Sequence, residues 1–253
     1  MCERTRFMMD ITVASFIAVA IIIVGTACTQ AVVGFGFALL SVPILIQVIG
    51  FHQAVILATF IGTANNLYQN RELRRDQDVV QVKRFLYASF LGAPIGAIAF
   101  RFADQQVLKI FLGIGVLLGV VLLVRGKDLS EAHVSLDWAM GVLSGFLLTT
   151  TSTNGPPLVF ALQARKSSPQ VFRATLNRIF LISGVYAIFL FVVFGEVAIS
   201  DLLLAASMLP SMIIGVSIGR VIRNRIDPDR FRLAVLVLLT IAGFSSVYSG
   251  VFQ

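Results

Sequence analysis

The longest charge-free stretch of the sequence restricts the fold more than any other feature. Residues 11–70 contain no Asp, Glu, Lys or Arg. A transmembrane helix needs about 20 predominantly apolar residues, so this stretch alone has room for up to about three crossings. A water-soluble domain carries charged side chains throughout its surface and offers no place for such a segment. The stretch therefore predicts helices embedded in a membrane.

The composition of the whole chain supports the same conclusion. Of its 253 residues, 57% are hydrophobic and 13% are charged, and the mean hydropathy is +0.91. A typical soluble domain is about one-quarter charged. These values exclude a soluble enzyme, a protein that binds nucleic acid and a disordered chain. The net charge of +7 is typical of membrane proteins, whose cytoplasmic loops collect Lys and Arg. We therefore predict an all-α, polytopic, multi-pass protein surrounded by membrane lipid.

The distribution of charge predicts how the helices are oriented. Basic residues concentrate in segments 71–84, 165–178 and 220–232, which the positive-inside rule places in the cytoplasm. The connection 196–201 contains Glu and Asp but no basic residue, so we expect it outside. The stretch 125–137 is then cytoplasmic, because two apolar runs separate it from 71–84. This arrangement places the C-terminus outside.

Weak self-similarity divides the chain into two halves. At an offset of roughly 116 to 119 residues several small residues align, and Arg101 aligns with Arg220. Loops at matching places differ in charge, which is the pattern of an inverted-topology repeat and is common in secondary transporters. We therefore expect two inverted transmembrane repeats, residues 1–124 and 125–253, with eight to ten membrane segments in all. Chance alignment of small residues in apolar helices is the alternative explanation.

Two stretches place helix breakers and small polar groups inside apolar sequence. The first is 29–43, with Gly34 and Gly36, and the second is 149–158. Backbone that is not helical at membrane depth needs protein or a water-filled cavity around it. A broken helix offers free N–H groups and partial positive charge at its new N-terminus, which suits an anion. Close helix packing is the other explanation for the two glycines.

Side chains at and near these stretches are candidates for contact with a substrate. Pro156 and Pro157 suit the first turn of a helix that starts again, because proline lacks the N–H that would be unpaired there. Arg173 and Asn177 are four residues apart, so a helix would place a guanidinium beside an amide, and that pair binds carboxylates or sulfonates. Arg173 is equally well explained as a loop arginine that only sets orientation. The candidate substrate-binding residues are Gln30, Gly34, Gly36, Thr150, Thr153, Asn154, Gly155, Pro156, Arg173 and Asn177.

Further polar residues lie on one of the apolar segments. Thr59 and Thr63 share a helix face, as do Thr63 and Asn66, and Asn65 lies beside them. The sequence contains no zinc-protease, serine-hydrolase or Walker A motif and no metal-ligand spacing. We therefore expect no enzymatic activity, no cofactor and no metal. Neither of the two histidines is assigned a role in proton transfer.

Two motifs lie at the interruptions: Gln30-x-x-x-Gly34-Phe35-Gly36-Phe37-Ala38-Leu39 with Pro43, and Asn154-Gly155-Pro156-Pro157-Leu158 followed by Phe172-Arg173-Ala174-Thr175-Leu176. They resemble those of the sulfite exporter TauE/SafE family, also described as the four-toluene-sulfonate uptake permease family. Members often carry a third glycine in the first motif, where this chain has Phe37. The resemblance implies an integral transporter of the bacterial inner membrane that moves small sulfur-containing or organic anions.

We therefore expect a transporter that binds a small anion, such as sulfite or a sulfonate, between two broken helices and exposes it alternately to the two sides. An anion channel and a membrane assembly partner that transports nothing are the alternatives, and an intramembrane enzyme is less favoured. The sequence leaves open the identity of the anion, the direction of transport, the coupling ion and the formation of a homo-oligomer.

Overall fold

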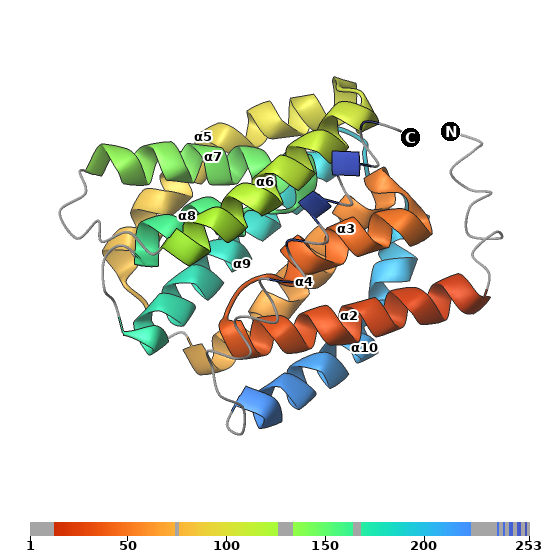
Figure 1. The fold of residues 1–253 in the computed structure, drawn as a ribbon, viewed down its shortest axis with the longest axis horizontal. Helices are drawn as coiled ribbons and strands as arrows, with labels where there is room; N and C mark the ends of the chain where they lie inside the picture. The colour runs from red at the N-terminus through yellow and green to blue at the C-terminus, as the bar shows by residue number, and fades with distance from the viewer. Residues whose placement is uncertain are drawn as a thin grey trace.

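The computed structural model contains only helices in the residues that it describes. These are 13–73, 76–125, 134–163 and 168–223, with seven further positions between 237 and 251. Within them nine helices and no strand are present (Figure 1), which confirms the predicted all-helical fold. The helices are α2 (Val13–Val33), α3 (Phe37–Ile49), α4 (Phe51–Leu73), α5 (Val79–Phe102), α6 (Gln105–Arg125), α7 (Val134–Thr151), α8 (Gly155–Gln163), α9 (Pro169–Val193) and α10 (Ile199–Arg223).

Some expectations fall on parts of the chain that lie outside the described residues. They include the position of the C-terminus, most of the stretch 125–137 with His133, and the basic residues of 224–232. For the described residues, helix positions repeat along the chain. α3 and α8 begin 118 residues apart, and so do α4 and α9. This spacing falls within the offset at which the sequence resembles itself, whereas the inversion of the two halves stays a prediction.

Four helices in the described part of the chain are long and apolar enough to cross a membrane, namely α2, α5, α10 and residues 170–193 of α9. α3 has 13 residues and α8 has 9, which correspond to about 20 Å and 14 Å of helix. Each is shorter than the hydrocarbon core of about 30 Å. Neither helix is therefore long enough to cross a membrane by itself, as expected for the pieces of a broken helix.

Two close helix pairs lie at opposite edges of the molecule, with α3, α4, α8 and α9 between them (Figure 1). One pair joins α5 to α7 and the other joins α2 to α10. Glycines four residues apart make both contacts possible, because a Cβ at these positions would overlap the backbone of the facing helix or, at Gly141, the Ala88 side chain. Spacings of this kind are typical of membrane helices that approach closely. The glycines are Gly92 and Gly96 of α5, Gly141 and Gly145 of α7, and Gly215 and Gly219 of α10.

The two pairs connect elements from different halves of the chain. α5 belongs to the first half and packs on α7 of the second, whereas α10 belongs to the second half and packs on α2 of the first. Large apolar side chains such as Leu91, Ile95, Phe189 and Val193 are exposed on the outer surface, as expected for helices that face lipid. The interior therefore lies between the two pairs, where α4 contacts α9.

Ion pairs join the helices at both ends of the molecule. At one end Arg84 of α5 lies 2.6 Å from Asp137 of α7, and Arg220 of α10 lies 3.1 Å from Glu72 of α4. Arg101 lies 17 residues beyond Arg84 on α5, about 26 Å along the helix, and there faces Glu196 at 4.0 Å. The basic segments 71–84 and 220–223 are thus at the end opposite to the acidic connection before α10. The side of the membrane that each end faces stays a prediction.

Candidate functional site

The first helix break lies between α2 and α3 and is built from glycine. The Gly34 N–H donates to the Gln30 carbonyl at 2.7 Å, which closes α2. Gly34 and Gly36 then adopt φ of +93° and +102°, a region that glycine reaches without steric cost. Gly36 precedes α3 and provides no side chain to cap it. The first N–H groups of α3, those of Phe37, Ala38 and Leu39, therefore have no acceptor within the helix.

The two glycines differ in what surrounds them. A side chain at Gly34 would overlap the aliphatic part of Arg173, so this glycine makes room for a close contact with α9. At Gly36 nothing lies within 4 Å of the position that a Cβ would take. Close packing, the alternative explanation for both glycines, thus accounts for Gly34 and not for Gly36. Gly36 instead leaves the start of α3 open to approach.

The second helix break lies between α7 and α8 and is built from side chains that can donate hydrogen bonds. Ser152 has a φ of 59°, which is uncommon for a residue other than glycine. Its N–H donates to the Leu148 carbonyl at 2.9 Å, and the hydroxyls of Thr151 and Thr153 lie 2.7 Å apart. The Ser144 hydroxyl donates to the Asn154 carbonyl at 3.0 Å. These bonds pair polar groups that the break would otherwise leave unsatisfied.

α8 begins at Gly155, so both prolines lie in its first turn, as predicted. Neither Pro156 nor Pro157 has an N–H. Of the first three residues of α8, only Gly155 therefore has a backbone donor. The start of α8 contributes the partial positive charge of a helix N-terminus with fewer free N–H groups than the start of α3.

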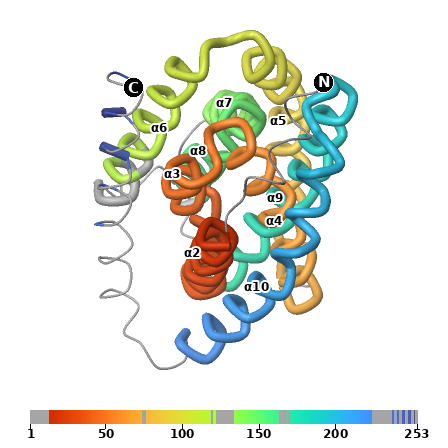
Figure 2. The backbone as a smooth tube through the Cα atoms, turned by 90° about the vertical axis from the view of Figure 1, so that its right-hand side faces the viewer, coloured from red at the N-terminus to blue at the C-terminus, as the bar shows by residue number. Residues whose placement is uncertain are grey.

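The two breaks meet at one cavity. A Cβ on Gly155 would lie 3.6 Å from Leu39 Cδ1, so the first turns of α3 and α8 are neighbours (Figure 2). Between them is a cavity of about 50 Å³. The cavity is lined by Gln30, Gly36, Phe37, Ala38, Leu39, Ala58, Thr59, Gly62, Thr63, Asn66, Leu148, Ser152, Thr153, Asn154, Gly155, Phe180 and Gly184. None of these side chains is charged.

α4 and α9 complete the wall and connect it to the two breaks. The hydroxyl oxygens of Thr59 and Ser152 are 3.0 Å apart, which joins α4 to the second break. Asn154 Nδ2 reaches Ser183 Oγ of α9 at 3.5 Å. The wall therefore combines hydroxyl and amide groups from three parts of the chain with apolar surface from Phe37 and Phe180.

A chain of buried amide side chains holds the first break in place. Gln69 Nε2 donates to Asn65 Oδ1 at 2.9 Å, and Asn65 Nδ2 donates to Gln30 Oε1 at 2.9 Å. Gln30 Nε2 and Asn177 Nδ2 both donate to Asn66 Oδ1, at 2.8 and 3.2 Å. The end of α2 is thereby fixed to α4 and α9. Since an amide nitrogen carries two protons, Gln30 retains one donor besides its bond to Asn66.

The structure places half of the predicted substrate-binding residues in the cavity wall. These are Gln30, Gly36, Thr153, Asn154 and Gly155. The remaining five lie around it rather than in it.

Three of those five, Gly34, Arg173 and Asn177, belong to the first break or contact the residues that hold it in place. Arg173 is half-buried beside Gly34, and its aliphatic part covers that glycine. Asn177 lies one helical turn further along α9 and contacts the wall through Asn66. The other two belong to the second break. The Thr150 hydroxyl donates to the Phe146 carbonyl of its own helix at 2.8 Å, and Pro156 is the second residue of α8.

Several lining residues are absent from the predicted set. The sequence could have identified Thr59, Thr63 and Asn66 as lining residues, because these polar side chains recur on one helix face of an apolar segment. Ser152 lies within the predicted break. Nothing in the sequence distinguishes Gly184 and Phe180, since an apolar helix contains many such residues and only packing determines which of them face a cavity. The lining residues outside the predicted set are Phe37, Ala38, Leu39, Ala58, Thr59, Gly62, Thr63, Asn66, Leu148, Ser152, Phe180 and Gly184.

Comparison with protein families connects this arrangement to known proteins. The family model described as Sulfite exporter TauE/SafE matches residues 17–246. The match includes both helix breaks and every residue that lines the cavity. Comparison with curated proteins and with solved structures gave no match.

Proposed function

Because the chain belongs to the sulfite exporter TauE/SafE family, we propose that it carries a small anion through the cavity between its two helix breaks. The family is one of membrane transporters of the sulfite and sulfonate type, and the apolar helices fit a membrane protein. We place the chain in the cell inner membrane. One observation carries the proposal: two helix N-termini meet at a single polar, uncharged cavity.

The electrostatics of this cavity favour the binding of an anion and also allow its release. A helix N-terminus carries about half a positive charge, and α3 and α8 both begin at the cavity wall. The free N–H groups of Phe37 and Ala38, together with Asn154 and the second proton of Gln30, can donate hydrogen bonds. Such bonds offset the cost of removing an anion from water. With no full positive charge in the wall, binding stays weak enough for dissociation.

In this proposal Arg173 does not bind the anion directly, although its spacing to Asn177 suggests a pair that would. It lies beside Gly34, outside the cavity wall, with its aliphatic part against the first break. From there the guanidinium raises the local positive potential, and charge near a cleft increases the rate at which anions arrive. We therefore assign Arg173 to attracting the anion rather than to holding it.

The ion pairs at the two ends of the molecule support a mechanism in which the cavity opens to one side of the membrane at a time. Arg101 near the end of α5 faces Glu196 in the connection before α10. Arg220 near the end of α10 faces Glu72 at the end of α4, in the part of the chain that leads to α5. The two pairs thus have equivalent places in the two halves. We propose that each pair closes one end of the molecule and that they open alternately.

Counterflow in proteoliposomes tests this function and separates a carrier from a channel. Vesicles loaded with unlabelled sulfite are diluted into radiolabelled sulfite. A carrier accumulates label above the equilibrium level for a time, whereas a channel only equilibrates it. We expect accumulation. Failure of sulfite, sulfate, thiosulfate and methanesulfonate alike to drive it, with folded protein in the vesicles, would contradict the proposal.

A pair of threonine variants connects the activity to the cavity. Thr59 and Thr29 both donate to the carbonyl four residues earlier, at 2.8 and 2.9 Å, but only Thr59 lines the cavity. We expect Thr59→Ala to lower counterflow about threefold to tenfold, since the lost hydroxyl contributes about 1 kcal/mol. Thr29→Ala serves as the matched control and should transport normally. Equal effects of the two variants would remove Thr59 from the substrate site.

A further inference from the structure

We propose that Phe37 and Phe180 limit the size of the transported anion, so that the cavity accepts inorganic sulfur oxyanions and excludes aryl sulfonates. The proposal rests on the transport function proposed above and deepens it by naming the substrate class. It also identifies the two residues that determine this specificity.

The volume of the cavity sets the limit. It is about 50 Å³, about a third of the roughly 150 Å³ of a cavity that binds benzene. Sulfite, which has only one sulfur and three oxygen atoms, needs much less space than a benzene ring. Benzenesulfonate adds a phenyl ring to a similar group and exceeds this space. The cavity therefore distinguishes the two classes of anion by size.

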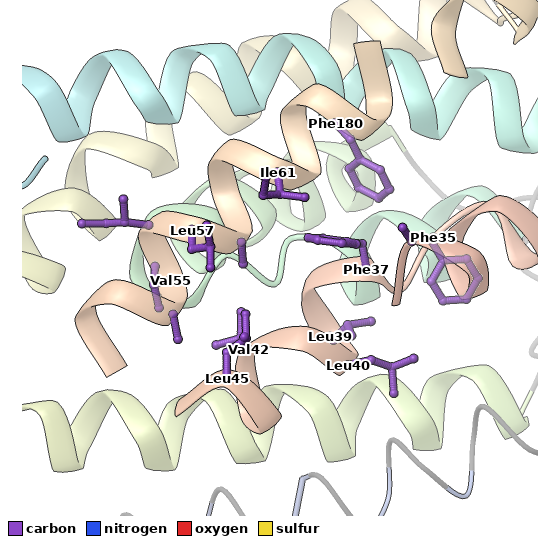
Figure 3. Close-up of a cluster of buried hydrophobic side chains, with 14 of the residues drawn as sticks. Phe35, Phe37, Leu39, Leu40, Val42, Leu45, Val55, Leu57, Ile61 and Phe180 are labelled. Atoms are coloured by element: carbon purple, nitrogen blue, oxygen red, sulfur yellow. The ribbon is translucent and has the colours of Figure 1, made fainter. Parts of the chain in front are cut away.

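The two phenylalanine rings take up the space that a larger anion would need. Phe37 is the first residue of α3 and Phe180 lies on α9, and both line the cavity. Both are buried, with 3% and 7% of their surface exposed. Figure 3 shows the two rings beside the segment of α4 that carries Ile61. The two rings are the bulkiest apolar side chains of the wall, and they come from opposite halves of the chain.

Each ring lies near a glycine on another helix. A Cβ on Gly62 of α4 would lie 3.4 Å from Phe37 Cδ1, and a Cβ on Gly155 of α8 would lie 3.9 Å from Phe180 Cζ, which are ordinary van der Waals contacts. Since both rings are buried and packed interiors resist rearrangement, a larger ligand would have to displace neighbouring groups to move them.

Substrate selectivity in proteoliposomes tests the proposal. Counterflow of radiolabelled sulfite is measured with sulfite, methanesulfonate or benzenesulfonate as the internal anion. For the wild type we expect benzenesulfonate to be at least about tenfold less effective than sulfite, the scale of steric discrimination by a pocket. Phe180→Ala and Phe37→Ala each remove a phenyl ring from the wall. We expect each variant to raise the ratio of benzenesulfonate to sulfite activity about tenfold.

Phe189→Ala is the matched control, because Phe189 lies on the same helix as Phe180 but is 58% exposed on the outer surface. Its ratio should stay at the wild-type value. Phe180→Leu and Phe37→Leu keep more of the packing, so they give the same test if the alanine variants fail to fold, and their ratios should rise by a smaller factor. Folding is checked by thermal unfolding in detergent.

Two results would overturn the size limit while leaving the transport function in place. In one, the wild type exchanges benzenesulfonate as fast as sulfite. In the other, all folded variants at both phenylalanines keep the wild-type ratio. If no anion drives counterflow by the wild type, the transport function itself fails and the size limit fails with it.

Discussion

The break between α2 and α3 is made of glycine, whereas the break between α7 and α8 is made of hydroxyl residues, asparagine and proline. The first break leaves N–H groups of α3 unpaired and exposes them at Gly36. The second removes two N–H groups through Pro156 and Pro157 and presents the side chains of Thr153 and Asn154. The same cavity is therefore lined by backbone donors on one side and by side-chain donors on the other.

This difference determines how each side of the cavity responds to substitution. A side-chain donor is lost when its residue is replaced, but a backbone donor stays and can only be displaced. Substitution at the first break should therefore act through geometry, with losses of both stability and transport. Substitution at the second should act through binding, with the fold largely unchanged. The following variants test that distinction.

We expect the largest effect from Gly36→Ala. Its φ of +102° is a strained conformation for alanine, which costs about 1–3 kcal/mol of stability, and the new methyl group would enter the approach to α3. Counterflow should fall more than about 100-fold, because a misplaced backbone affects every N–H of the first turn. Counterflow and thermal unfolding are measured together.

Gly25→Ala is the control for this variant, since Gly25 lies within α2 with nothing within 4 Å of its Cβ position. Alanine is the better helix former by about 1 kcal/mol, so its stability should stay the same or rise and transport should persist. A Gly36→Ala protein that transports normally would show that the start of α3 does not hold the anion.

An intermediate effect is expected from Asn154→Ala at the second break. A hydrogen bond to a charged group contributes about 1.5–3 kcal/mol, so half-saturation by sulfite should rise about 10- to 100-fold. The melting temperature without ligand should change little, because the contact between the Asn154 side chain and Ser183 is long, at 3.5 Å. Asn70→Ala, at the end of α4 and outside the cavity wall, is the control. Loss of folding instead of affinity would contradict a binding role.

The smallest effect is expected from Pro156→Ala, which adds an N–H to the first turn of α8. If side chains provide the donors at this break, sulfite affinity should change less than about threefold, well below 1.4 kcal/mol. Stability should fall by at most about 1 kcal/mol through the more flexible unfolded chain. Affinity is measured from the rise in melting temperature with sulfite concentration. If sulfite instead binds about tenfold more tightly to the variant, both breaks bind the anion through backbone N–H groups. The prolines would then only weaken binding at the second break.

The sequence by itself determined the helical class and the positions of both breaks. Both signals are local: apolar runs without charges need helices in lipid, and glycine and proline interrupt them through their own backbone geometry. The first break at Gly34–Gly36 and the restart of α8 at Gly155 follow from such residues. The resemblance to the family was carried by the same two motifs, so the membership that the family model shows over residues 17–246 could be predicted without a structure.

Only the tertiary structure decided which side chains face the cavity. Thr150 and Thr153 lie in the same polar run, yet Thr150 bonds to its own helix and Thr153 lines the wall. The left-handed turn at Ser152 redirects the chain between them. Phe180 has no local signal at all, because its role depends on α8 and α3, which come from distant parts of the sequence. A helix sequence specifies the spacing of its side chains along a face, but the neighbouring helices determine what that face meets.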